Sequence, residues 1–237
     1  MKKINYLLVV FMMVALSGCY TTGLSMREKG GFNYTNLVYS LYDENASDNA
    51  EVAKLQKPIR LAVAQVGENT PPEAMLNVLA EKKLLISKIA VIPVGGEETN
   101  YHSNLKEPTQ EEFAKKMRKM RNLAKDLGTD YVFLFGGNAD YGTSASWLQF
   151  FDLTLVGGYL IPSNKIKAEG RAAGALIDVK TGKVVFIVNA EAEKQEHAPT
   201  FIAYDRQEDV VVRLRDELAD KITINFVNQL ASFQEEI

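Results

Sequence analysis

The stretch Asp130-Tyr131-Val132-Phe133-Leu134-Phe135-Gly136 decides the fold prediction. Its apolar run is uninterrupted, which is typical of a strand in a sheet that is buried on both faces. A helical pattern precedes it, because Thr109 to Glu112 has the form of a capping box and Gly128 is suited to end a helix. The apolar residues between these ends follow three-and-four spacing, at Phe113, Met117, Met120, Ala124 and Leu127. A helix that leads into a buried strand is the repeating unit of an α/β fold.

The same alternation occurs toward the N-terminus. Residues 59–66 form a predicted strand that Gly67 ends, and residues 88–94 form a second one. Between them, Thr70-Pro71-Pro72-Glu73 predicts a helix start with Thr70 as the cap and Glu73 in the capping-box place. We expect this helix to run through Leu76, Leu79 and Leu84. The order up to Gly136 is therefore βαβαβ.

The second half of the chain predicts a hairpin and a covering helix. Residues 170–179 and 184–190 are rich in β-formers, and Lys180-Thr181-Gly182-Lys183 between them is a turn signal. Residues 191–203 are predicted to be a loop, and Phe135-Gly136-Gly137-Asn138 a turn. Residues 205–233 form an amphipathic helix, whose apolar stripe is Val211, Leu214, Leu218, Ile222, Phe226, Leu230 and Phe233.

These elements predict one α/β (α+β) domain over residues 34–237. It combines a βαβαβ unit with a mixed sheet, a C-terminal β-hairpin and a long C-terminal helix. A short helix over residues 34–42 is expected to dock on it. Residues 95–108 form a polar loop, long for a compact domain and therefore a candidate functional loop.

The most apolar stretch after the leader is SWLQFFDLTLVGGYLIP, residues 146–162. Asp152, two glycines and a proline break it too often for a membrane-spanning helix. Three interpretations stay open: packing under the sheet, an oligomer or partner surface, and contact with lipid. On the second interpretation, the candidate partner surface consists of Trp147, Phe151, Leu155 and Tyr159.

The N-terminus has the layout of a secretory signal. Lys2 and Lys3 precede an apolar run over residues 6–16, and small residues follow. Leu16-Ser17-Gly18-Cys19 resembles a bacterial lipobox, in which the cysteine sulfur receives a diacylglyceryl group and the leader is cut before it. This resemblance implies a signal peptide over residues 1–18, a lipidated tether over 19–33 and membrane anchoring through Cys19. The competing interpretation is an ordinary signal that ends near a buried thiol.

Lipidation of Cys19, the only cysteine, would limit both where the protein is located and which chemistry it can perform. Tyr20 stands where an aspartate is the usual signal for inner-membrane retention, so the resemblance implies the periplasmic face of the outer membrane in a host with two membranes. The mature chain then has no thiol for a nucleophile, a disulfide or a metal cluster. Loss of the leader also removes two positive charges and moves the formal net charge from −3 to −5, which disfavours nucleic acid as a partner.

No catalytic constellation is visible, and we expect a chain that is not an enzyme and has neither metal nor cofactor. The two histidines, His102 and His197, fall in predicted loops, and neither a G-x-S-x-G elbow nor a zinc spacing occurs. Glu191, Glu193 and Glu196 with His197 allow a divalent-cation site on paper. Alternating glutamates at a strand end are more typical of a solvated face.

Across nearly the whole mature chain, the sequence resembles the rhombotarget lipoproteins of Gram-negative bacteria. The matching segments are residues 37–42, 59–66, 89–93, 127–132, 154–162 and 175–179, and the closing helix. The resemblance implies association with rhomboid-type sorting proteases, but no reaction. A weaker likeness concerns the fold: the Asp178, Thr181-Gly182 hairpin after a βαβαβ unit is similar to periplasmic lipoproteins of the curli-secretion channel type and to the amino-terminal domain of the Tol-associated β-propeller protein.

The sequence leaves two possible functions. The leading one is a lipid-anchored periplasmic scaffold or adaptor in envelope assembly or surface-protein sorting, with a protein partner or a second copy bound at residues 146–162 or 95–108. The alternative is a small periplasmic ligand-binding module that takes its ligand where residues 63–66 and 133–136 end.

Overall fold

The computed structural model describes residues 26–27, 55, 57–66, 68–94, 110–148, 152 and 154–233. The leader, the lipobox, most of the tether, the predicted helix at 34–42 and the loop at 95–108 lie outside these residues. The elements, in chain order, are β1 (Met26–Arg27), β2 (Ile59–Gln65), α3 (Glu73–Glu81), β3 (Ile86–Val91), α4 (Gln110–Asp126), β4 (Tyr131–Ala145), α5 (Leu155–Leu160), β5 (Asn164–Asp178), β6 (Val184–Ala198), η2 (Thr200–Ile202) and α6 (Ala203–Ser232).

The chain divides into two compact units. The first comprises Met1–Met26, Tyr141–Lys167 and Gln195–Val210, and the second comprises Arg27–Asp140, Ala168–Lys194 and Val211–Ile237. Strands β4, β5 and β6 and helix α6 contribute residues to both. The single domain expected over residues 34–237 stays a prediction, and each unit is described by itself.

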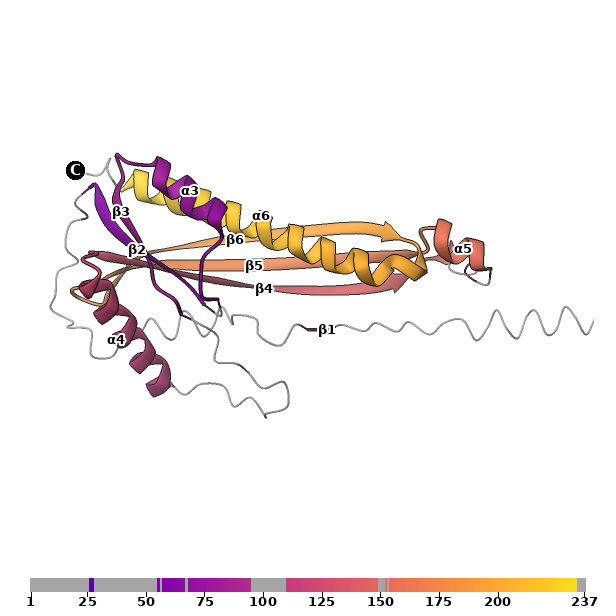
Figure 1. Cartoon of the computed structure of the whole chain (residues 1–237), viewed down its shortest axis with the longest axis horizontal. Helices are drawn as coiled ribbons and strands as arrows, with labels where there is room; N and C mark the ends of the chain where they lie inside the picture. Colours follow the sequence, from indigo (N-terminus) through magenta and orange to yellow (C-terminus); the bar gives the residue numbers. More distant parts are fainter. Residues whose placement is uncertain are drawn as a thin grey trace, which may run out of the picture. The chain divides into compact units, whose positions relative to one another are not determined.

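The sheet has the strand order β3-β2-β4-β5-β6, with β1 pairing to β4. Strand β2 pairs in parallel with β3, where Leu61 is opposite Ile89, and with β4, where Leu61 is opposite Tyr131. The short turn between β5 and β6 makes that pair antiparallel, so the predicted mixed sheet is confirmed. In the second unit, α3 and α6 cover one face of the sheet and α4 covers the other (Figure 1).

The core of the second unit lies on both faces of this sheet, as the unbroken apolar run of β4 predicts. On one face, Phe133 packs against Phe226 of α6 with ring centroids 4.1 Å apart, and Phe186 of β6 lies 5.7 Å from the same ring. On the other face, Val132 and Leu134 join a buried cluster with Met120 and Ala124 of α4.

Helix α3 differs from its prediction at both ends. It begins at Glu73 with Pro72 as its N-cap, and no side chain caps it, so the prediction of Thr70 as the cap is wrong. Because Pro72 disfavours a helical conformation at the residue before it, the helix starts only after the second proline. The helix ends at Glu81, so Leu84 lies beyond it and is 89% exposed.

The turn predicted at Phe135-Gly136-Gly137-Asn138 is wrong, because β4 continues to Ala145. A Cβ atom on Gly137 would lie 2.8 Å from the carbonyl oxygen of Arg171 on β5. The glycine at this position therefore permits the close approach of two strand backbones. The predicted loop over residues 191–203 is also wrong, because β6 continues to Ala198 and α6 begins at Ala203.

The hairpin between β5 and β6 is confirmed at the predicted turn. The Asp178 carboxylate accepts hydrogen bonds from the backbone N–H of Thr181 at 2.6 Å and from its hydroxyl at 3.0 Å. Gly182 has a φ of +76°, a left-handed conformation that glycine adopts without strain. The closing helix is confirmed as well, since Val211, Leu214, Leu218, Ile222, Phe226 and Leu230 are all buried.

Candidate functional site

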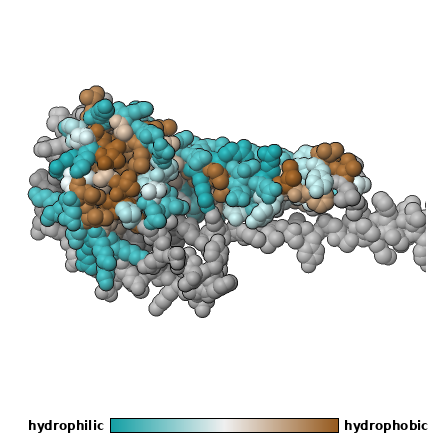
Figure 2. Space-filling model, in the orientation of Figure 1, coloured by the Kyte–Doolittle hydropathy of each residue, from teal (hydrophilic) through white to brown (hydrophobic). Residues whose placement is uncertain are grey.

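The first unit carries an exposed apolar face on the short helix α5. Val156, Tyr159 and Leu160 lie at i, i+3 and i+4, and all three are exposed, Leu160 to 72%. These three residues, called the α5 face below, share one side of the helix because of this spacing. Figure 2 shows the corresponding hydrophobic surface at the α5 end of the view.

The opposite side of α5 is packed within the same unit. Gly158 is buried, and a Cβ atom there would lie 2.4 Å from the ring of Phe201, whose segment follows β6. The ring of Tyr159 lies 4.6 Å from the ring of Phe201. Because glycine has no side chain, α5 can lie against this ring, with Tyr159 at the edge of the contact and Val156 and Leu160 exposed to solvent.

A polar cluster holds the segment that carries α5. The backbone N–H of Ser146, directly after β4, donates to the carbonyl oxygen of Ser163, directly before β5, at 2.7 Å. The fully buried Ser163 hydroxyl donates to the Asp152 carboxylate at 2.8 Å. The Thr200 hydroxyl donates to the same carboxylate at 2.5 Å and accepts from the Asn164 amide at 2.6 Å. The two ends of the segment between β4 and β5 are therefore joined by a backbone hydrogen bond, and side-chain hydrogen bonds to Asp152 hold the segment in place.

The structure places the predicted partner-surface residues as follows. Trp147 is 79% exposed after β4, and Tyr159 is exposed on α5, so packing under the sheet is wrong for these two side chains. Leu155 begins α5, but its side chain lies outside the described residues, as does the whole of Phe151. The lipobox residues Leu16, Ser17, Gly18 and Cys19 also lie outside them.

Sequence patterns missed three parts of this site. Val156 and Leu160 lie within the predicted apolar stretch but are not among the predicted surface residues, although they share i, i+3, i+4 spacing with Tyr159. The cluster of Asp152, Ser163 and Thr200 has no local signal, because its members are 11 to 48 residues apart.

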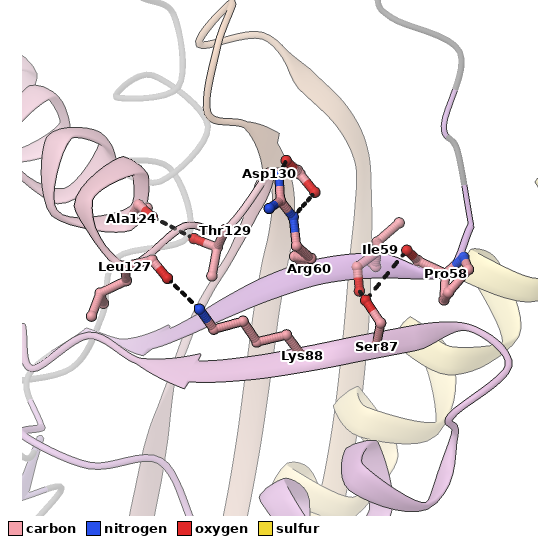
Figure 3. Close-up of polar contacts among 9 residues, drawn as sticks. All are labelled: Pro58, Ile59, Arg60, Ser87, Lys88, Ala124, Leu127, Thr129 and Asp130. Carbon is pink, nitrogen blue, oxygen red and sulfur yellow. Dashed lines mark hydrogen bonds and ion pairs between the residues drawn. The ribbon is translucent and has the colours of Figure 1, made fainter.

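In the second unit, a polar network ties the parallel strands to the end of α4 (Figure 3). Arg60 of β2 donates to both carboxylate oxygens of Asp130, and Lys88 of β3 donates to the carbonyl oxygen of Leu127 at 2.6 Å. The hydrogen bonds from Arg60 hold the pKa of Asp130 below its ordinary value. Arg60 and Asp130 neutralise each other's charge, and the ammonium group of Lys88 is hydrogen-bonded to a backbone carbonyl. We therefore assign this network a role in the stability of the fold.

A polar groove of about 430 Å³ also lies in the second unit. Its lining has both signs of charge, and two of the lining residues, Arg171 and Glu191, form an ion pair at 3.4 Å. The residues that line it are Asn138, Asp140, Glu169, Gly170, Arg171, Glu191, Ala192, Glu193 and Lys221.

Of the histidines and glutamates considered for chemistry, those that the structure describes all lie on β6. His102 lies outside the described residues, while His197 is exposed on β6 rather than in a loop. Glu191 and Glu193 point outward in the alternating pattern of β6. Within the described ranges, no three histidine, cysteine or acidic side chains are arranged to hold a metal ion.

No helix among the described residues combines the length and the apolar character needed to cross a membrane. The chain matches no protein-family model, and no curated protein matches it.

The solved structures that are similar to this chain at a low level include two bacterial proteins. A Caulobacter crescentus protein described as a lipoprotein is 17% identical, with 48% of this chain and 81% of that chain covered and a TM-score of 0.29. Lipoprotein GNA1162 from Neisseria meningitidis is 17% identical, with 66% of this chain and 99% of that chain covered and a TM-score of 0.26. At these scores the likeness carries no conclusion about this chain.

Proposed function

We propose that this chain is a lipid-anchored protein of the bacterial cell envelope that has no enzymatic activity and binds a protein partner through the α5 face. The anchor is argued from the sequence: a basic start, an apolar run and Leu16-Ser17-Gly18-Cys19 together have the form of a lipobox. On this proposal, the anchored chain stands on the periplasmic side of the outer membrane and serves as a scaffold or adaptor in assembly or sorting at the cell surface.

The observation that carries the docking role is the contrast between the two sides of α5. Its inner side is fixed by Phe201 and by the buried Ser163–Asp152 hydrogen bond, whereas the side chains of the α5 face are more than half exposed, even where the ring of Tyr159 contacts Phe201. A fixed, exposed apolar face loses little conformational entropy when a partner covers it. Aromatic residues such as Tyr159 and Trp147 are also the types that concentrate at protein interfaces.

Photo-crosslinking in intact cells tests this proposal. Probes replace Trp147 and Tyr159 one at a time, with a probe at the exposed Gln195 of β6 as the control in the same unit. We expect a distinct crosslinked protein, or a second copy of the chain, at both test positions and not at Gln195. Equal labelling at all three positions, or adducts with lipid alone, would contradict docking of a protein on this face.

A second test separates the anchor from the docking surface. Cys19→Ser removes the proposed lipid attachment and should release the chain from the membrane fraction. We expect the yield of crosslinks from Tyr159 to fall in that variant, because the chain is no longer held at the membrane where its partner is. A Cys19→Ser chain that stays in the membrane fraction would refute the lipid anchor and leave the α5 face to be judged by its own crosslinks.

The alternative, a small ligand-binding module, has one observation in its favour. The side-chain oxygen of Gln65, at the end of β2, is buried and accepts no hydrogen bond from the described residues. Strand β4 does not end beside it, however, so the paired strand ends that we expected to frame a ligand are not formed. A screen of periplasmic metabolites for thermal stabilisation, with Gln65→Leu as the control, tests this role.

A further inference from the structure

Strand β6 is the last strand in the sheet order, so one of its sides has no neighbouring strand among the described residues. It is 15 residues long. An open edge of this length offers a row of backbone N–H and C=O groups that a strand from another molecule can pair with. The question is how this edge is closed in the folded chain.

Helix α6 supplies polar side chains to this edge. Asn225 donates to the backbone carbonyl oxygen of Asn189 at 2.7 Å, and Lys221 donates to that of Glu191 at 3.1 Å. Residues two apart on a strand direct their carbonyl groups to the same side. Two successive outward acceptors of β6 are therefore occupied by side chains of the helix.

One turn earlier on α6, Glu217 extends the same row. Its carboxylate pairs with Lys194 of β6 and, at 2.7 Å, with Lys221 of its own helix. Hydrogen bonds from both lysines lower the pKa of Glu217 to about 2. The three residues Glu217, Lys221 and Asn225, called the α6 row below, are spaced by four and meet Lys194, Glu191 and Asn189 of β6 in reverse order.

We propose that the α6 row closes the β6 edge against pairing with β6 of a second copy of this chain. Lys221 and Asn225 of the row occupy two of the backbone acceptors that such a strand needs, and Glu217 pairs with Lys221 and Lys194 beside them. The device is independent of the proposed docking role of the α5 face. It confines association to surfaces other than this edge.

A second barrier lies on the strand itself and has to be separated from the row. In the antiparallel register that places Glu191 of one β6 opposite Glu193 of the other, the pairing brings like charges together, and like charges opposite each other disfavour pairing. The test therefore uses five full chains in detergent: the wild type, Glu191→Gln/Glu193→Gln, Lys221→Ala/Asn225→Ala, the combination of both pairs, and Lys221→Arg in the Glu191→Gln/Glu193→Gln background. Lys221 and Asn225 are exposed, and alanine has the higher helix propensity, so α6 is retained.

The readouts are the concentration dependence of the molecular mass and the hydrogen exchange of the β6 amides. We expect the combined variant to associate and its outward β6 amides to exchange at least about tenfold more slowly when associated. The glutamine pair alone should behave like the wild type, and Lys221→Arg in the glutamine background should retain closure. Either of two results would overturn the proposal: a combined variant no more associated than the wild type, or a glutamine pair that associates as strongly as the combination.

Discussion

Arg60 and Asp130, 70 residues apart in sequence, are joined by two hydrogen bonds between their side chains, one of 2.8 Å from Nε and one of 2.5 Å from a terminal nitrogen. The backbone N–H of Asp130 also donates to the carbonyl oxygen of Arg60 at 2.8 Å. This three-point contact stands at the start of the parallel pairing of β2 with β4 and thus helps to set its register.

Replacing Asp130 by Asn should lower the melting temperature near neutral pH, by a small amount because both side chains are half-exposed. The folded pKa of Asp130 lies below its ordinary value of 3.8, so the contribution of the charged form is present above pH 3.8. It is lost as the pH falls through the folded pKa. Thermal melts of both proteins from pH 7 to pH 2 should therefore converge at the acid end. As a control, Asp216→Asn at an exposed position of α6 should leave the melting temperature near neutral pH unchanged.

Two glycines of β4, Gly137 and Gly142, are expected to respond differently to replacement by alanine. A Cβ atom on Gly137 would meet the Arg171 carbonyl oxygen at 2.8 Å, while nothing lies within 4 Å of a Cβ atom on Gly142. Gly137→Ala should cost about 1–3 kcal/mol of unfolding free energy, because a backbone oxygen cannot move aside as a side chain can. Gly142→Ala should stay within about 0.5 kcal/mol of the wild type. Equal costs in denaturant unfolding would show that the strand spacing at Gly137 is not what requires the glycine.

The parts of the fold that local patterns predict are those whose cause is local. The apolar run around Phe133 needs burial on two faces, and the three-and-four stripe of α6, which includes Leu214 and Phe226, needs one apolar surface. Both are confirmed. The turn between β5 and β6 also follows from its own residues, since Asp178 and Gly182 supply the hydrogen bonds and the backbone conformation that it requires.

The parts that patterns missed depend on residues far away in sequence. Gly137 looks like a turn residue until the backbone of Arg171 is placed beside it. The charged end of β6, including Glu193, looks like a loop because edge strands expose polar side chains on one face. The support of α5 could not be predicted either, since Ser163 and Thr200 meet Asp152 only after both hairpin arms are in place.

Leu79 and Leu84 test whether α3 ends at Glu81, as the structure shows. Leu79 is fully buried and Leu84 is 89% exposed, although both were expected on the core side of one helix. Leu79→Ala should destabilise the chain by about 2–5 kcal/mol through lost burial and a cavity. Leu84→Ala should leave the unfolding free energy within about 0.5 kcal/mol of the wild type. Chemical denaturation of the two variants compares them directly, and a loss of more than 2 kcal/mol in Leu84→Ala would place that side chain in a core after all.

The last prediction concerns the support beneath the α5 face. Ser163→Ala removes a fully buried hydroxyl that donates to the Asp152 carboxylate, and it leaves one carboxylate with fewer donors. We expect a loss of about 1–3 kcal/mol in the stability of the segment between β4 and β5, because hydrogen bonds to charged groups are among the stronger ones. Hydrogen exchange should become faster there while the β2–β3 pairing in the second unit keeps its protection.

The conservative change Thr200→Ser keeps a hydroxyl for the same carboxylate and serves as the matched control. If Ser163→Ala also weakens crosslinking from Tyr159 while Thr200→Ser does not, then the α5 face works only when it is held in place, which is what a preformed docking surface requires. Crosslinking that is unchanged in Ser163→Ala, despite faster exchange of the segment, would instead mean that the partner orders α5 itself. The buried cluster would then serve the stability of the first unit and not the presentation of its apolar face.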